Sequence, residues 1–187
     1  MINKTVSYYN NADDSKSKIR YNLDYVLGMI RDNQELFQQT VKLRSMPTEE
    51  EYKQAKKLLP MIAPSGVFDY RNDDPENLRE YSNVLVLDFD HFQSRLDAGE
   101  FKRNLIDNAD RLHVYALWFS PSRLGVKVAM IHDSTNPMYH NELFRCIREQ
   151  LYPGVAQFDD KCGNLSRTFF LSSDPEIYIN PQRDSLT

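Results

Sequence analysis

The sequence predicts an α+β protein with an antiparallel sheet, preceded by a helical N-terminal part. In the first sixty residues, apolar side chains recur at helical spacing. From residue 83 onward, short β-prone apolar runs appear between helical patterns, and two of these runs are joined by a tight turn. Hydrophobic residues make up 41% of the 187 residues, which is enough for a packed core. We expect a single domain over 1–187, in which 1–80 is the mostly helical part with a connector and 81–187 is the core.

The N-terminal part contains two helical signals. The first predicts a helix over about 17–32 with one buried face, because five apolar residues recur at helical spacing: Ile19, Leu23, Val26, Leu27 and Ile30. The second is a capping box, formed by Thr48 and Glu51, which opens a short helix ending near Leu59. Prolines and a glycine then interrupt the pattern, so 60–80 is expected to be an ordered but irregular connector.

The core is expected to begin with a strand at 83–87, because this continuous apolar run is typical of a strand buried on both faces. Two further runs, at 113–120 and 126–132, flank the turn Pro121–Gly125 and predict a β-hairpin. The remaining elements are a helix over about 96–110, a helix beginning near Pro137, and strands near 167–173 and 176–180. Their order is that of the split-βαβ, ferredoxin/RRM-like arrangement, an antiparallel sheet with helices on one face.

Charge and cysteine content limit the classes of partner and compartment. The net charge of -4 argues against a protein that coats duplex DNA through a broad basic surface, although a local basic patch remains compatible with it. No apolar run approaches the roughly 18 residues needed to cross a bilayer, and the first residues lack the apolar stretch of a signal peptide. Cys146 and Cys162 form no CxxC pair. We therefore expect a cytoplasmic protein without a membrane partner.

Two aspartates follow the buried strand directly. Asp88 and Asp90 are alternate residues, so their carboxylates are expected to share a face, about 7 Å apart along the chain. Like charges at that spacing repel unless a cation lies between them, and Mg²⁺ or Mn²⁺ prefers such oxygen ligands. A third carboxylate is expected from Asp159. In the alternative interpretation, Asp88 and Asp90 cap the next loop and Asp159 lies in a solvated turn.

A basic turn separates these acidic segments in the sequence. The hairpin turn carries Ser122, Arg123 and Gly125, and Lys127 follows it. Gly125 can adopt a positive φ and let the backbone approach a ligand, while the hydroxyl and the basic groups can hold phosphate oxygens. Arg167 follows Asp159 by eight residues, and we expect it to face the same centre. The alternative is a solvent-facing hairpin tip.

Together these segments resemble the three motifs of the archaeo-eukaryotic primase superfamily, the PrimPol-like enzymes. The first motif is an apolar strand ending in Asp-x-Asp, matched by Val84–Asp90. The second resembles Ser122–Lys127, with Lys127 where a histidine is expected. The third is an apolar residue before an aspartate, matched by Phe158-Asp159, and related phage and plasmid primases carry an arginine at about the spacing of Arg167.

More narrowly, the chain resembles the VirE N-terminal domain family of bacterial mobile-element proteins. The likeness lies in Leu59–Phe68, Leu87–His91, Ser120–Ser122 with Gly125 and Lys127, Ser166-Arg167, and Asp174-Pro175 to Asn180-Pro181. Such domains often precede a P-loop helicase-like module, and no GxxxxGK[ST] motif occurs in this sequence. The resemblance implies nucleotides, single-stranded or primed DNA or RNA, and a P-loop helicase-like module or protein as partners in mobile-element replication.

The resemblance implies a primase-type nucleotidyltransferase that uses Mg²⁺ or Mn²⁺ in two-metal catalysis. The implied metal ligands and catalytic residues are Asp88, Asp90 and Asp159; the implied nucleotide-binding residues are Ser122, Arg123, Lys127 and Arg167. A lysine neutralises phosphate as a point charge, without the tunable protonation of an imidazole. Phosphate binding therefore tolerates the lysine at this position better than polymerisation does.

Three other functions remain open from the sequence. The domain can be a catalytically weak nucleotide or single-strand binding module, with Tyr115 and Trp118 either stacking bases or packing in the core. It can be a haloacid-dehalogenase-type phosphatase, in which Asp88 is a nucleophile, although the following segment reads as a hairpin instead of repeated βα units. It can also be a structural or interaction domain. The four histidines have no metal-ligand spacing, so a zinc site is not expected.

Overall fold

The computed structural model describes residues 2–16 and 18–183 and confirms an α+β protein with antiparallel sheets. Five α-helices are described in these residues: α1 Leu23–Asp32, α2 Gln34–Arg44, α3 Glu49–Lys57, α4 Arg95–Asp107 and α5 His140–Leu151. The strands are β1 Thr5–Tyr9, β2 Ile19–Asn22, β3 Met61–Ala63, β4 Gly66–Phe68, β5 Leu78–Tyr81, β6 Val84–Phe89, β7 Val114–Phe119, β8 Val126–Ile131, β9 Phe169–Phe170 and β10 Tyr178–Ile179. Short 3₁₀ turns occupy Pro75–Asn77 (η1), Pro137–Tyr139 (η2) and Asp160–Gly163 (η3). No described helix has the length and apolar character required to span a bilayer.

The strands form two four-stranded sheets and one hairpin. The core sheet has the order β10-β7-β8-β6, and the second sheet has the order β2-β1-β3-β9. The strands β4 and β5 pair separately. Each of these pairings between described strands is antiparallel. The β7–β8 pair confirms the predicted hairpin.

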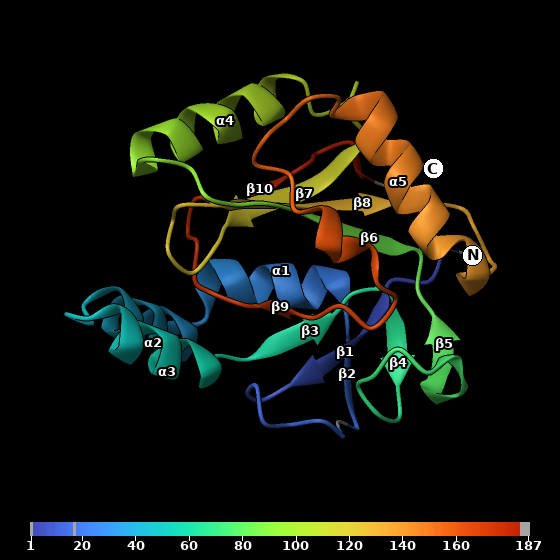
Figure 1. Ribbon diagram of the computed structural model, residues 1–187, viewed down its shortest axis with the longest axis horizontal. Helices are drawn as coiled ribbons and strands as arrows, with labels where there is room; N and C mark the ends of the chain where they lie inside the picture. The colour runs from blue at the N-terminus through green and yellow to red at the C-terminus, as the bar shows by residue number, and fades with distance from the viewer. Residues whose placement is uncertain (1, 17, 184–187) are drawn as a thin grey trace.

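The core sheet is covered on both faces. In Figure 1, α4 and α5 lie on one side of it, while α1 lies on the other side, between the two sheets. The two helices of the core therefore share one face, as expected, and α1 of the helical N-terminal part packs its apolar residues against the opposite face. This arrangement explains why every residue of β6 and β7 is buried, as the continuous apolar run at 83–87 predicted.

The ferredoxin-like strand order is not confirmed. The strand β8 lies between β6 and β7, as the split-βαβ pattern requires. The last strand, β10, pairs with β7 at the far edge instead of with β6. The strand β9 leaves the core sheet altogether and pairs with β3 in the second sheet. Because β9 and β10 contain two residues each, their apolar patterns are too short to specify a partner.

The N-terminal part contains more strand than the sequence indicated. The predicted helix over 17–32 begins only at Leu23, because Ile19–Asn22 pairs with β1 and the Asn22 side chain caps the helix. The helix α2 was not predicted. The capping box is confirmed, since the Thr48 side chain accepts a hydrogen bond from the Glu51 backbone and α3 follows. Within one large cluster of buried side chains, Val6, Val26 and other residues of 1–80 pack with residues of β6, β7 and β8.

Candidate functional site

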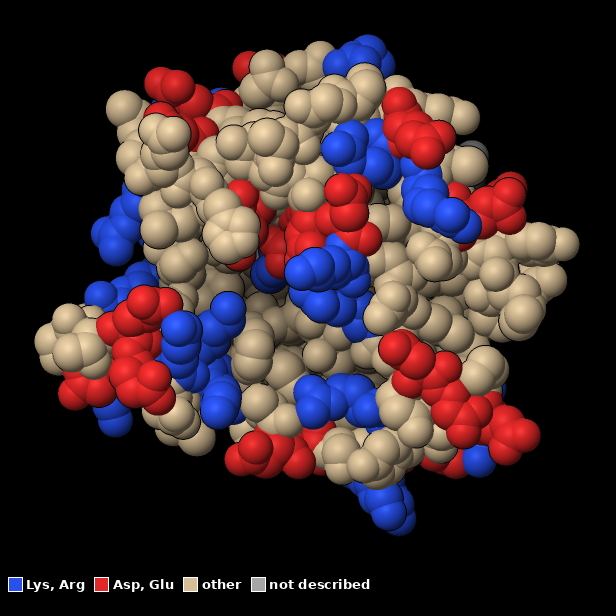
Figure 2. Space-filling model, viewed as in Figure 1, with Lys and Arg blue, Asp and Glu red and all other residues tan. Residues whose placement is uncertain are grey.

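A polar cavity of about 350 Å³ lies between the core sheet and the second sheet. Its lining comes from α3, the end of β6, the β7–β8 turn, β8, the loop before η3, the segment between η3 and β9, and β9 itself. The lining residues are Lys56, Asp88, Asp90, Ser120, Pro121, Ser122, Lys127, Asp159, Arg167, Thr168, Phe169 and Phe170. Figure 2 shows acidic side chains gathered above a hollow near the centre of this face, with basic side chains beside and below it. Six of the seven residues predicted for the site therefore share one cavity.

Strand register places Lys127 beside Asp88. The two residues are directly opposite each other in the antiparallel β6–β8 pair. Lys127 Nζ donates to Asp88 Oδ2 at 2.5 Å, and the residues are only 5% and 8% exposed. The other carboxylate oxygen, Asp88 Oδ1, is buried and has no hydrogen-bond partner among the described residues. Lys127 therefore occupies one oxygen of the Asp88 carboxylate, and the other oxygen has no described hydrogen-bond donor.

The loop before η3 brings Asp159 to the same place. Phe158 forms an isolated antiparallel bridge with Phe89 at the open edge of β6. The Asp159 backbone N–H donates to the Asp88 carbonyl at 2.9 Å, and the Asp90 N–H donates to the Gln157 carbonyl at 2.8 Å. This short stretch of backbone pairing aligns the late aspartate with the early pair. The sequence supports the candidate residue but contains no signal for the pairing.

The Asp159 carboxylate is held by several donors. Its Oδ1 accepts from the Lys161 backbone at 3.0 Å, and its Oδ2 accepts from Cys162 Sγ at 3.2 Å and from Arg167 Nη2 at 3.1 Å. Burial by itself raises the pKa of Asp159, but the Lys161 and Cys162 hydrogen bonds and the Arg167 charge outweigh it, so the pKa lies below the ordinary value. Asp159 is thus anionic at neutral pH. Burial raises the pKa of the Cys162 thiol to about 12.

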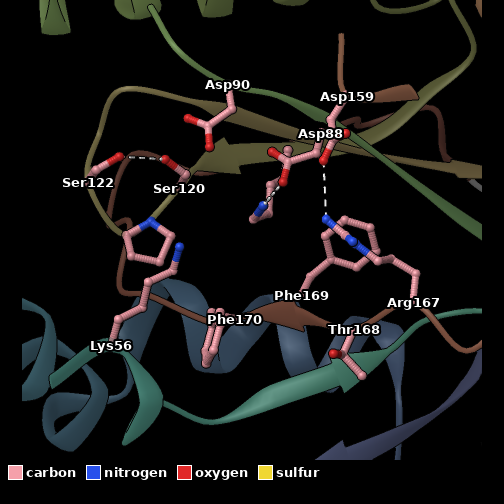
Figure 3. A pocket seen from close by; sticks show the side chains of 12 residues that line it. Lys56, Asp88, Asp90, Ser120, Ser122, Asp159, Arg167, Thr168, Phe169 and Phe170 are labelled. Atoms are coloured by element: carbon pink, nitrogen blue, oxygen red, sulfur yellow. Dashed lines mark hydrogen bonds and ion pairs between the residues drawn. The ribbon is translucent and has the colours of Figure 1, made fainter. Parts of the chain in front are cut away.

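Asp90 lies at the hairpin side of the cavity. Its Oδ1 accepts from the His91 backbone N–H at 2.9 Å. Figure 3 shows its carboxylate apart from Asp88 and Asp159, which lie close together. A Cβ added at Gly125 would stand 2.8 Å from Asp90 Oδ1 and 2.8 Å from the Phe89 carbonyl oxygen. The three aspartates were expected to converge. Asp88 and Asp159 lie close together, whereas Asp90 lines the same cavity at its rim.

The β7–β8 turn differs from its predicted geometry at two residues. The positive φ belongs to Arg123, at 61°, and not to Gly125, which is required for close packing instead. Arg123 does not line the cavity, because its guanidinium lies over the Phe119 ring and 3.5 Å from Glu176. Ser122 does line it, with Oγ 3.1 Å from Ser120 Oγ. The Pro121 carbonyl accepts from Arg44 of α2 at 3.0 Å, so the turn packs on the N-terminal helices and is not a free tip.

Residues 53–179 match the family described as BT4734-like, N-terminal domain. The chain belongs to this family. The matched segment runs from α3 to β10, so every residue that lines the cavity lies within the BT4734-like N-terminal domain. No curated protein and no solved structure is significantly similar to the chain.

The BT4734-like N-terminal domain also contributes residues that sequence reasoning did not assign to the site. Lys56 lies on α3 with its ammonium 5.3 Å from the centre of the Phe170 ring. Burial, followed by the charge of Lys127, lowers the pKa of Lys56. The basic run of α3 was a weak signal for Lys56, whereas nothing in the sequence placed β9, and with it Phe169 and Phe170, beneath the aspartates.

The aromatic residues named for base stacking lie elsewhere. Tyr115 and Trp118 are 1% and 0% exposed, so they pack in the core of the domain. The aromatic rings that reach the cavity are Phe169 and Phe170. A base entering the cavity would therefore meet Phe170, which is half-buried, and not the hairpin strand.

The donor set of the domain fits a divalent cation. One carboxylate oxygen each of Asp88 and Asp159 and the sulfur of Cys162 lie within 4.8 Å of one another. Mg²⁺ is commonly held by one or two carboxylates together with water and substrate phosphates. The two close carboxylates, the unpartnered Asp88 Oδ1 and the adjoining cavity satisfy that description.

Proposed function

We propose that this domain binds a divalent cation and a nucleoside triphosphate between its two sheets and transfers the nucleotidyl group to a 3′-hydroxyl, as primase-polymerases do. The observation that carries the proposal is the approach of Asp88 and Asp159, distant in sequence, at a cavity that also contains Lys56, Lys127 and Arg167. The resemblance to PrimPol-like enzymes and to the VirE N-terminal domain, noted from the same aspartates, supports it.

The charges of the cavity suit a polyphosphate. Its lining includes three carboxylates and three basic side chains, whose formal charges balance: Asp88, Asp90, Asp159, Lys56, Lys127 and Arg167. A bound divalent cation adds positive charge, and a polyphosphate supplies the matching negative charge. A neutral ligand would leave that charge unbalanced.

Each residue has a role in this proposal. Asp88 and Asp159, with Asp90 at the rim, would hold Mg²⁺ or Mn²⁺. The cation, when bound, supplies the Lewis acidity that lowers the pKa of the attacking hydroxyl and neutralises phosphate charge. Lys127 and Arg167 each contact one of these carboxylates and would also bind phosphate oxygens, together with Lys56, which lines the same cavity. Ser122 donates to a phosphate oxygen at the turn, and Phe170 provides an apolar ring for the base.

The partners follow from this activity. The substrates are nucleotides and a single-stranded or primed DNA or RNA, and the biological setting is replication of a mobile element beside a P-loop helicase-like module. A cytoplasmic location belongs to the same proposal and is supported by the two free cysteines, Cys146 and Cys162.

A second candidate is a module that binds nucleotides or single strands without chemistry. It is favoured by the direct Lys127–Asp88 and Arg167–Asp159 ion pairs, which stabilise both carboxylates without a metal. The phosphatase alternative has no comparable support, because it requires repeated βα units and the described strand pairs of the core sheet are antiparallel.

The test is template-directed incorporation of dNTPs or NTPs with Mn²⁺ and with Mg²⁺. We expect incorporation by the wild type and by Asp160→Asn, an exposed neighbour that contacts Arg148, and none by Asp88→Ala or Asp159→Asn. Circular dichroism checks that each variant is folded. Equal incorporation by the wild type and Asp88→Ala would end the enzymatic proposal. Nucleotide binding without turnover would favour the second candidate.

A further inference from the structure

The sulfur of Cys162 lies beside the two close aspartates. Asp159 caps η3 with its side chain, and Cys162, three residues later, donates its S–H to Asp159 Oδ2 at 3.2 Å. The tight donor group is therefore Asp88, Asp159 and Cys162, in which sulfur occupies the position that the sequence suggested for an oxygen of Asp90. The residue is 2% exposed, so this thiol is shielded from bulk solvent.

An independent observation is that this group contains a buried carboxylate oxygen that no described hydrogen bond satisfies. Asp88 is 8% exposed, yet its Oδ1 has no hydrogen-bond partner among the described residues. A buried carboxylate oxygen without a partner is unfavourable, because no hydrogen bond compensates the loss of its hydration. Its other oxygen is already satisfied by Lys127. A cation bound at Oδ1 would satisfy the free oxygen without displacing the lysine.

Donor chemistry determines which cations suit this group. Mg²⁺ and Ca²⁺ take oxygen ligands, whereas Zn²⁺ and Co²⁺ also accept thiolate sulfur. Around a tetrahedral zinc ion, with bonds of about 2.0–2.3 Å, neighbouring donors stand about 3.5 Å apart. The donor atoms here lie within 4.8 Å of one another, so small side-chain rotations bring them onto such an ion. Three protein ligands leave a fourth position, and Asp88 and Asp159 both line the cavity.

We propose that Asp88, Asp159 and Cys162 form a three-ligand site for a thiophilic divalent cation of the Zn²⁺ or Co²⁺ class, with its fourth position open to the cavity. On binding, the S–H bond of Cys162 breaks, a metal–sulfur bond forms, and the proton leaves to solvent, with no change of oxidation state. Lys127 and Arg167, each paired with one of the aspartates, offset the charge of the three anionic ligands together with the divalent cation. This site shares Asp88 and Asp159 with the proposed Mg²⁺ or Mn²⁺ site, differs from it by the sulfur ligand, and does not require nucleotidyl transfer.

The test is a Co²⁺ titration of the purified chain, followed by optical absorption. We expect a sulfur-to-cobalt charge-transfer band and intense d–d bands of a tetrahedral ion in the wild type. The matched control is Cys146→Ser, which changes an exposed cysteine on α5 and keeps both signals. Cys162→Ser loses the charge-transfer band and binds Co²⁺ about tenfold more weakly or worse, while its Mn²⁺ affinity stays within about threefold.

A second pair of variants covers the case in which Cys162→Ser does not fold. Asp159→Asn is expected to weaken Co²⁺ binding and the band, and the adjacent Asp160→Asn is expected to retain both. A wild type without the charge-transfer band, or a Cys162→Ser protein that keeps it, overturns the inference. If Co²⁺ binds through sulfur but the protein incorporates no nucleotide, the metal site stands and the proposed enzymatic function fails. If the protein incorporates nucleotides with Mn²⁺ but shows no charge-transfer band, the enzymatic function stands and the metal site fails.

Discussion

At the residue scale, the site is dominated by an ion pair between a lysine and the aspartate directly opposite it in the sheet. Lys127 and Asp88 are both buried and 2.5 Å apart, so each compensates the desolvation of the other. Removing either one leaves an unpaired buried charge, which typically costs about 3–5 kcal/mol. Asp88→Asn also leaves Lys127 without a counter-charge, but it keeps the side-chain volume and a hydrogen-bond acceptor, so it disturbs the fold less than Asp88→Ala.

At the residue scale, Lys56 gives the clearest test of the phosphate site. In Lys56→Ala we expect the affinity for tripolyphosphate, measured by calorimetry with Mn²⁺, to fall roughly tenfold through loss of one charge-assisted contact. Lys57→Ala, at the exposed neighbouring position on α3, is expected to change the affinity by less than about twofold. Equal losses of affinity in the two variants would show that only the total positive charge of α3 contributes, and that Lys56 makes no specific contact.

His140 predicts a specific acid sensitivity. It is 4% exposed beside Tyr81, and burial lowers its pKa from 6.5 to about 4. Because the depressed pKa belongs to the folded state, the unfolded chain takes up the proton first, and stability that is complete above pH 6.5 is lost as the pH falls toward 4.

Chemical denaturation at pH 7 and pH 4.5 measures this effect. From pH 7 to pH 4.5 the free energy of unfolding falls in both proteins. We expect this decrease to be roughly 2 kcal/mol smaller in His140→Gln than in the wild type. His132 lies close by, with a pKa that burial also lowers, so part of the acid sensitivity remains in the variant. An identical pH dependence in both proteins would contradict the burial argument for His140.

At the scale of elements, the sequence predicted those helices and strands whose apolar pattern, cap or turn spans several residues. The β7–β8 hairpin, the helix near 96–110 and the capping box before α3 followed from turn residues, periodicity and caps. The strands β9 and β10, with two residues each, had no pattern that could assign them to different sheets. The contact of Asp159 with Asp88 depends on a single backbone bridge beside β6, which no sequence periodicity can reveal.

The β7–β8 turn offers a matched pair of glycine variants. Gly125→Ala places a methyl group 2.8 Å from both Asp90 Oδ1 and the Phe89 carbonyl oxygen, so we expect a destabilisation of roughly 2 kcal/mol. Gly99→Ala lies within α4 with no atom within 4 Å of its added Cβ, and it is expected to stabilise by about 0.5–1 kcal/mol. Urea denaturation measures both. A Gly125→Ala protein as stable as the wild type would contradict the close packing of the turn on β6.

At the scale of the whole molecule, the cavity depends on both parts of the chain. The core sheet supplies Asp88 and Lys127, and Asp90 follows the end of β6. Asp159 comes from the loop before η3, and the second sheet with α3 supplies Phe169, Phe170 and Lys56 (Figure 3). The helix α1 lies between the sheets and contributes to the same buried cluster as β6 and β7 (Figure 1). The sequence indicated the aspartates and the hairpin, while the opposite wall arose from packing between distant segments.

Because one cluster of buried side chains joins the two parts, we expect one cooperative unfolding transition. Trp118 is fully buried in β7, so its fluorescence reports on the core sheet, whereas far-UV circular dichroism reports on all helices. The two signals are expected to change at the same urea concentration. A loss of helical signal that precedes the fluorescence change would show that the N-terminal part unfolds separately.

The most direct test of the central claim is Mn²⁺ binding in the presence of a nucleoside triphosphate, followed by electron paramagnetic resonance. The claim predicts saturable binding by the wild type and by Asp160→Asn, and an affinity about tenfold lower or worse in Asp159→Asn. Indistinguishable Mn²⁺ affinities in the wild type and Asp159→Asn would contradict it, because the two aspartates would then not share a cation.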